Sequence, residues 1–114
     1  MTDEVNTLVI PTAERESFVL CLALGTLEAI LADNWSAEAG TWTLARPAFI
    51  APLQQSGIPT DVLDVLSSAD ELSAIEKFVG KEAVKGRVTE MIAVIRNRLA
   101  ALPERSWSAR WLGD

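Results

Sequence analysis

The sequence predicts an all-α protein, a compact single-domain bundle of five or six helices. Two long segments, about 12–33 and 81–102, carry apolar residues at helical spacing. Between them lie shorter apolar segments separated by proline, glycine and serine, which end one helix and start the next. The chain has 114 residues, 49% of them hydrophobic and 23% charged, which suits one apolar core and leaves no room for a second. We therefore treat residues 1–114 as one helical domain, with an N-terminal arm at 1–11 and a C-terminal tail at 103–114.

The first long helix is expected to begin near Thr12, whose hydroxyl suits the N-cap position, and to end at Asp33. Its residues from Phe18 to Leu24 are apolar on nearly every side, which indicates neighbouring elements on several sides. Glycine within a helix costs about 1 kcal/mol relative to alanine. We therefore expect Gly25, in the middle of this helix, to permit the close approach of another backbone.

Two short helices are expected next. Ser36 is a suitable N-cap for a helix over about 37–45, which Pro47 ends because the residue before a proline avoids the helical region. Pro52 then predicts a short or broken helix over 48–55.

The second half of the chain continues the helical pattern. Residues 59–66 contain a two-turn apolar face, and Ser68 and Glu71 have the spacing of a capping box that starts a further helix. Gly80 is expected to end that helix. The last helix has the clearest amphipathic stripe in the chain. The residues of this stripe are Val84, Val88, Met91, Ile92, Ile95, Leu99 and Leu102.

One segment departs from the helical pattern. Residues 7–10 have strand propensity, and residues 41–44 are the one candidate for a partner strand. A short two-stranded ribbon is therefore the minor alternative to an entirely helical chain.

The amino acids that the chain lacks exclude many functions. It contains no histidine and no tyrosine, and Cys21 is its only cysteine. Imidazole or paired thiolates serve most acid–base catalysis near neutral pH, most nucleophilic catalysis by serine or cysteine, and almost every zinc, copper or haem site. The remaining carboxylates, amines and hydroxyls form no recognisable catalytic motif. We expect a protein that is not an enzyme and that binds no cofactor and no metal.

The single cysteine and the apolar run around it indicate the cellular compartment of the protein. A single cysteine cannot form an internal disulfide and suits a reducing compartment. The apolar run from Phe18 to Leu24 follows acidic residues, where a secretory signal would have basic ones, and Glu28 interrupts it. The run is shorter than the roughly 20 apolar residues that a membrane span requires. We therefore expect a cytoplasmic protein with no membrane contact.

Charge is unevenly distributed along the chain, which has a net charge of −6. Residues 1–80 hold 12 acids and 3 bases, whereas residues 81–114 hold 4 acids and 7 bases. The acids between 47 and 76 either stabilise helix N-termini or form a surface that attracts a basic partner. Nucleic acid is disfavoured as the main partner because the only basic surface expected is the last helix and its tail, and the basic residues of the helix are expected to pair with neighbouring acids. They are Lys85, Arg96 and Arg98.

Tryptophan provides most of the aromatic content. Trp35 and Trp42 bracket the second helix and are expected to pack in the core or at a hinge. Trp107 and Trp111 lie four residues apart in the tail, which at helical spacing places them on one face. They either fold back over the end of the bundle or, with the arginines that flank them, form a hot spot for binding a partner.

Carboxylates alone could in principle hold Mg²⁺. Asp61 and Asp64 lie three residues apart, and Glu71 and Glu76 follow. However, neither long helix carries the acid pair that all-α pyrophosphohydrolases use for magnesium, and Glu28 is expected at a helix edge or paired with an arginine. A magnesium-dependent hydrolase is therefore the third hypothesis.

Three stretches resemble a family of short bacterial proteins of unassigned function: Leu24 to Ile30, Pro47 to Leu53, and Glu71 to Glu76. The similarity extends over roughly residues 18–100. Orphan families of this size often prove to be immunity proteins, which neutralise a toxin made by the same cell. The resemblance thus implies a class of protein and not a chemistry.

The leading hypothesis is a non-catalytic protein-binding module, most concretely a cytosolic immunity protein that neutralises a cognate basic toxin domain. Its expected partner-binding residues are four acids that steer the toxin and two tryptophans that anchor it. They are Asp61, Asp64, Asp70, Glu71, Trp107 and Trp111. The second hypothesis is a self-associating structural protein, a homodimer that pairs through its last helix.

Overall fold

In this computed structural model the described part of the chain, residues 10–103, is all-α, as predicted. Its helices are α1 (Thr12–Leu31), α2 (Ala37–Leu44), α3 (Pro47–Gln55), α4 (Thr60–Ser68), the short 3₁₀ helix η1 (Ala69–Glu71), α5 (Leu72–Phe78) and α6 (Lys81–Ala100). Two residues separate α2 from α3, and α4, η1 and α5 follow one another directly. With adjoining segments joined, this part of the chain has four helices, slightly fewer than the five or six predicted. The two long helices lie within two residues of their predicted ends.

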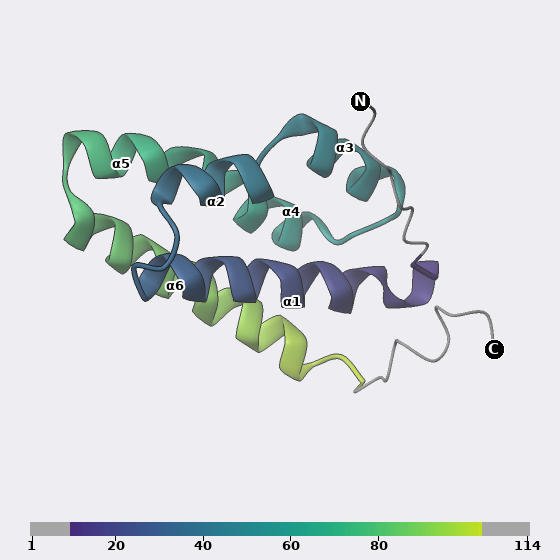
Figure 1. The fold of residues 1–114 in the computed structure, drawn as a ribbon. Helices are drawn as coiled ribbons and strands as arrows, with labels where there is room; N and C mark the ends of the chain where they lie inside the picture. Colours follow the sequence, from purple (N-terminus) through teal and green to yellow (C-terminus); the bar gives the residue numbers. More distant parts are fainter. Residues whose placement is uncertain (1–9, 104–114) are drawn as a thin grey trace, which may run out of the picture.

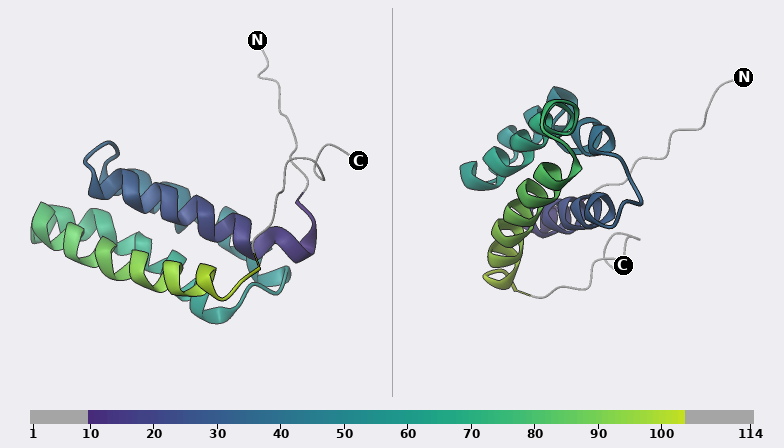
Figure 2. Two further views of the ribbon diagram at one scale, coloured as in Figure 1. Left: turned by 90° about the horizontal axis from the view of Figure 1, so that it is seen from below. Right: turned by 90° about the vertical axis from the view of Figure 1, so that its left-hand side faces the viewer.

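The helices form two layers (Figures 1 and 2). The long helices α1 and α6 run antiparallel, side by side, and form one layer. The shorter helices α2 to α5 pack over them as the second layer, with α2 against α1, η1 and α5. The chain reverses direction at the α5–α6 corner, where Gly80 has a φ of +120°. Glycine adopts this backbone conformation without strain, so the predicted break at Gly80 is confirmed, although α5 itself ends at Phe78 and its C-cap is Val79.

The core lies between the layers and receives leucine, isoleucine or valine from almost every helix. The predicted stripe of α6 supplies the buried residues Val84, Val88, Met91, Ile92 and Ile95. Helix α1, in contrast, is not enclosed on every side. Helices α6 and α2 both contact α1, so the expected neighbours on several sides are present, whereas Cys21 and Leu22 are exposed.

Helix starts were predicted with mixed success. The Ser36 hydroxyl oxygen accepts a hydrogen bond from the Ala39 N–H at 3.1 Å, which confirms this N-cap. Thr12 is the first residue of α1 and not its N-cap, which is Pro11. The capping box at Ser68 is wrong, because Ser68 lies in the last turn of α4 and donates a hydrogen bond to the Asp64 carbonyl.

Close packing occurs at a different glycine from the one predicted. A Cβ added to Gly25 would meet nothing within 4 Å, so Gly25 permits no close approach within the described chain. A Cβ added to Gly40 would lie 2.5 Å from Ile30 Cδ1 and 3.4 Å from Leu72 Cδ1. Gly40 is therefore the position where α2 packs most closely against α1 and α5.

The possible two-stranded ribbon, the tail and the expected absence of a membrane span involve other parts of the chain. Residues 41–44 belong to α2, so the candidate partner strand of the ribbon is helical. Residues 7–9 and the tail tryptophans Trp107 and Trp111 lie outside the described residues. None of the helices described is long and apolar enough to cross a membrane.

Candidate functional site

Oppositely charged side chains link the two long helices. Each of three basic residues of α6 pairs with an acid in or just after α1, as the charge pattern predicted. The pairs are Lys85–Asp33 at 3.1 Å, Arg96–Glu28 at 2.7 Å and Arg98–Glu16 at 2.6 Å. The hydrogen bond from Arg98 to Glu16 raises the pKa of this guanidinium above its usual value.

Because of these pairs, the two layers differ in charge. Residues 10–36 hold four acids and one base, and residues 81–103 hold two acids and five bases, so the α1–α6 layer has no net charge. Residues 37–80, which form the α2–α5 layer, hold six acids and two bases. The net charge of the described residues is thus located on the α2–α5 layer, where it is −4.

The four predicted steering acids lie on one continuous helical stretch of that layer. We call them the acidic strip: Asp61 and Asp64 on α4, and Asp70 and Glu71 on η1. All four are exposed. Two have a basic neighbour on α6, since Glu71 lies 3.8 Å from Arg87 and the charge of Asp61 acts on Arg98. The strip therefore faces solvent, with its negative charge compensated by a basic neighbour at two of its four positions.

Two tryptophans that were expected in the core or at a hinge are exposed. Trp35 is 50% exposed and Trp42 is 58% exposed. The core side of α2 consists of Ala37, Gly40, Thr41 and Leu44, and these mostly small residues leave no space for an indole. The Arg46 guanidinium lies 3.9 Å from the centroid of the Trp42 ring, a cation–π contact that holds the ring on the surface.

A buried hydrogen bond joins the backbone of η1 to α2. The Thr41 hydroxyl donates to the Ala69 carbonyl at 2.7 Å, and Trp42 and Asp70 are the next residues along the two segments. Consecutive Cα atoms are only about 3.8 Å apart, so the backbones of Trp42 and Asp70 lie beside this contact. We call Trp42, Arg46 and Asp70 the α2–η1 surface.

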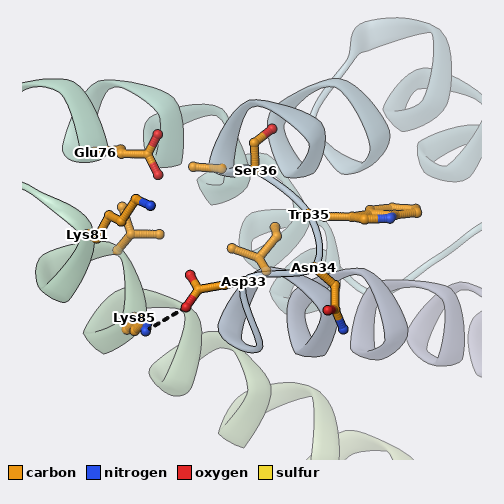
Figure 3. A pocket seen from close by; sticks show the side chains of 10 residues that line it. Asp33, Asn34, Trp35, Ser36, Glu76, Lys81 and Lys85 are labelled. Carbon is orange, nitrogen blue, oxygen red and sulfur yellow. Dashed lines mark hydrogen bonds and ion pairs between the residues drawn. The ribbon is translucent and has the colours of Figure 1, made fainter.

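A polar pocket of about 250 Å³ lies between the α1–α2 loop and the α5–α6 corner (Figure 3). The Asp33–Lys85 pair lies at one side of it, and Glu76 and Lys81 project into it from α5 and α6. Two carboxylates and two amines give the pocket no net charge. It therefore has no electrostatic preference for an ion of either sign.

An apolar groove of about 400 Å³ separates the start of α1 from α3. Six apolar residues line this α1–α3 groove: Ile10, Phe18, Val19, Phe49, Pro52 and Leu53. Arg15 and Ser56 form its polar edge, where the guanidinium donates to the serine hydroxyl at 2.7 Å. Its volume lies within the roughly 300–1,000 Å³ range of ligand pockets.

The acids considered for a magnesium site are dispersed. Asp61 and Asp64 lie on α4, whereas Glu71 is near Arg87 and Glu76 lines the polar pocket. Over residues 10–103 there is no group of three or more aspartates, glutamates or cysteines placed to hold a metal ion.

These features describe a small all-α protein with an acidic layer and an exposed aromatic side chain. The chain belongs to the family described as "Protein of unknown function (DUF3969)", whose model matches residues 11–113. The resemblance to an uncharacterised family is therefore confirmed, and it extends beyond the expected residues 18–100. No curated protein and no solved structure matches the chain.

Proposed function

We propose that this protein is a non-catalytic protein-binding module, most concretely a cytosolic immunity protein that binds and neutralises a basic toxin domain. The observation that carries the proposal is the α2–η1 surface. An exposed tryptophan and an exposed carboxylate directly follow the two residues that the Thr41–Ala69 hydrogen bond joins, on the layer that holds the net negative charge.

Trp42 is suited to be the anchor of an interface. Tryptophan is enriched among the residues that dominate binding energy, and an aromatic side chain contributes about 150–250 Å² of buried surface. The contact with Arg46 restrains the ring before binding, which lowers the entropy lost when the complex forms. The predicted anchors Trp107 and Trp111 lie outside the described residues, so Trp42 takes this role in the proposal.

The acidic strip would increase the rate of association. One-signed surfaces steer an oppositely charged partner and affect on-rates more than off-rates. Asp64 and Asp70 contribute most, because arginines of α6 neighbour the other two acids.

Affinity capture tests the proposal. Tagged wild type is compared with Trp42→Ala and with the matched control Trp35→Ala, an exposed tryptophan at the other end of α2. We expect wild type and Trp35→Ala to capture the same basic protein from the native host. We expect Trp42→Ala to bind it at least about 30-fold more weakly, as loss of a hot spot of about 2 kcal/mol implies.

A second step tests the immunity function. The captured protein is expressed in host cells with and without this protein, and growth should be arrested only without it. Equal capture by Trp42→Ala would contradict the proposed surface. If the captured protein is not toxic, the immunity role is contradicted, and only the protein-binding role is supported.

Self-association has less support. The stripe of α6 suggested a homodimer, but its residues from Val84 to Ile95 are buried against this chain's own helices and only Leu99 and Leu102 are partly exposed. Sedimentation at micromolar concentration measures the oligomeric state directly.

A further inference from the structure

We propose that two copies of this chain form a weak antiparallel dimer through the exposed face of α1, with the two helices crossing at Gly25. This face lies on the α1–α6 layer and the α2–η1 surface lies on the other layer, so the dimer goes beyond the proposed function. It also differs from the homodimer expected from the sequence, which pairs through the last helix.

The exposed face of α1 lies opposite the side that enters the core. We call it the outer face of α1: Cys21, Leu22, Gly25 and Ala29. The first three of these residues are exposed, and Ala29 is partly exposed. At 100° per residue the four lie within about 60° of Gly25, whereas the buried Ala23 and Leu27 lie about 160° from it. The contacts within the described chain therefore leave one side of α1 open.

Two properties of α1 have no explanation in the contacts of the described residues. Glycine lowers the stability of a helix relative to alanine, and a Cβ added to Gly25 would meet nothing within 4 Å. In addition, residues 17–27 include no charged residue, although an exposed helix face is ordinarily polar. A second helix that crosses at Gly25 explains both properties, because the absent side chain lets two backbones approach and there are no charges to desolvate.

The spacing of the outer face makes it complementary to a copy of itself. Leu22 precedes Gly25 by three residues and Ala29 follows it by four, and both lie on the same flank of the helix. They are thus about 4.5 Å and about 6 Å along the axis from Gly25, in opposite directions. In an antiparallel pair that crosses at Gly25, Leu22 of each copy therefore packs against Ala29 of the other, a large side chain against a small one. Two-fold symmetry repeats this contact, as a homodimer requires.

The charge distribution favours a second copy as the occupant of this face. Each chain has a net charge of −6, so two copies repel where their acids face each other. The α1–α6 layer has no net charge, and Glu28, at the edge of the outer face, is already paired with Arg96 at 2.7 Å. Two copies that meet on the outer face of α1 turn their acidic α2–α5 layers away from each other. A basic partner, in contrast, finds no excess of acids on this face.

The size of the outer face predicts a weak dimer. Residues 21–29 form about two and a half turns of helix. A contact of this length buries less than the roughly 1,000 Å² that a stable interface requires. We therefore expect a concentration-dependent equilibrium between monomer and dimer, in which the dimer is populated at about 1 mM.

Sedimentation of the full-length chain over a dilution series tests the dimer. Wild type is compared with Gly25→Glu and with the matched control Gly86→Glu. Gly86 is an exposed glycine of α6 at which a Cβ would also meet nothing within 4 Å, so both variants gain helix propensity, and in dilute solution neither should melt lower than wild type. Gly25→Glu places two like charges at the crossing and should weaken the dimer at least about 10-fold. Gly86→Glu adds the same charge elsewhere and should weaken the dimer clearly less.

Disulfide cross-linking tests the antiparallel alignment. Leu22→Cys and Ala29→Cys are made in separate chains that also carry Cys21→Ser, and the two proteins are mixed and oxidised. The proposed crossing brings these two positions of different copies together, so the mixture should form a cross-linked dimer. Each protein alone should cross-link far less, because equivalent positions of the two copies lie about 9 Å and about 12 Å apart along the helix.

A chain that is monomeric at about 1 mM, or a dimer on which Gly25→Glu has no larger effect than Gly86→Glu, would overturn the proposal. Cross-linking that is as efficient within one protein as in the mixture would show another alignment and would also contradict it. Trp42→Ala should leave the dimer unchanged, and neither glycine variant alters the α2–η1 surface, so this proposal and the proposed function fail separately.

Discussion

Two glycines show that a residue's role depends on its neighbours and not on its position in a helix. Gly25 and Gly40 both lie within helices, and the sequence predicted close packing at the first. The structure shows close packing at the second, where the small side of α2 meets Ile30. Helical periodicity identifies the core side of an element, but it does not show which element packs there.

Alanine substitutions at the two glycines should therefore have opposite effects. Gly25→Ala fills open space and gains helix propensity, so it should raise the free energy of unfolding by about 0.5–1 kcal/mol. Gly40→Ala should lower it by about 1 kcal/mol, because Ile30 is buried and must move within a packed core. Urea denaturation of both variants measures the difference. Equal stabilisation by both would contradict the close packing at Gly40.

The sequence predicts the role of some acidic residues of α1 but not of others. Glu28 was expected at a helix edge or paired with an arginine, and it pairs with Arg96. A helix rich in bases that packs against a helix rich in acids forms such pairs at many different alignments of the two helices. Glu14 and Glu16 lie two residues apart near the start of α1, yet Glu14 is fully buried while Glu16 forms an ion pair with Arg98. Tertiary packing separates these two roles, and no local pattern distinguishes them.

Among the helices, the overall extents were predicted better than the residues that cap their N-termini. The apolar periodicity of α1 and α6 and the breaks at Pro47 and Gly80 depend on local chemistry, which sequence displays. The capping box at Ser68 failed because Ala69 and Leu72 are both fully buried. A nearly continuous helical path places both on the core, and this packing outweighs the local cap.

The exposed tryptophans of the α2 region were missed for a related reason. In an eight-residue helix the apolar and small residues are too few to define one face without ambiguity. The available signal was the spacing of Ala37, Gly40, Thr41 and Leu44, which marks one side of α2 and excludes Trp42 from it.

The hydrogen bond between α2 and η1 should be measurable as stability. Thr41→Val keeps the shape of the side chain but leaves the buried Ala69 carbonyl without this donor, so we expect a loss of about 1–2 kcal/mol. Thr89→Val is the matched control, because that hydroxyl is exposed and bonds only to Lys85 four residues earlier, and it should change stability by less than about 0.5 kcal/mol. Similar losses in both variants would show that the α2–η1 contact has no special role.

For the molecule as a whole, charge is distributed by layer. The α1–α6 layer pairs its acids with its bases, whereas the α2–α5 layer has a net charge of −4 together with the exposed indole of Trp42. Exposed charges contribute little to folding and act on a partner over a Debye length of about 8 Å at physiological salt. In the proposed function, this excess charge serves association with a basic partner.

The steering role predicts a specific kinetic result. In the complex with the captured partner, Asp64→Asn with Asp70→Asn should lower the on-rate about 3- to 10-fold at low salt and flatten its dependence on ionic strength. The off-rate should change little. Stability should stay within about 0.5 kcal/mol of the wild type, because both side chains are exposed and Ser68 forms no capping box beside them.

The control makes the same change in net charge on the other layer. Glu82→Gln alters one exposed acid in the first turn of α6 and is compared with Asp64→Asn alone, and its effect on the on-rate should be clearly smaller because Glu82 lies on the other layer. Glu90 is left unchanged because it shares Arg87 with Glu71 of the acidic strip. Adding Asp61→Asn to the first pair should also lower stability by about 0.3–1 kcal/mol, since Asp61 lies in the first turn of α4 near the positive end of its dipole. Association kinetics at several salt concentrations and thermal melting of the same variants separate the two roles. If the Asp64 and Asp70 variant melts lower but associates at the wild-type rate, these acids stabilise the helix and do not steer a partner.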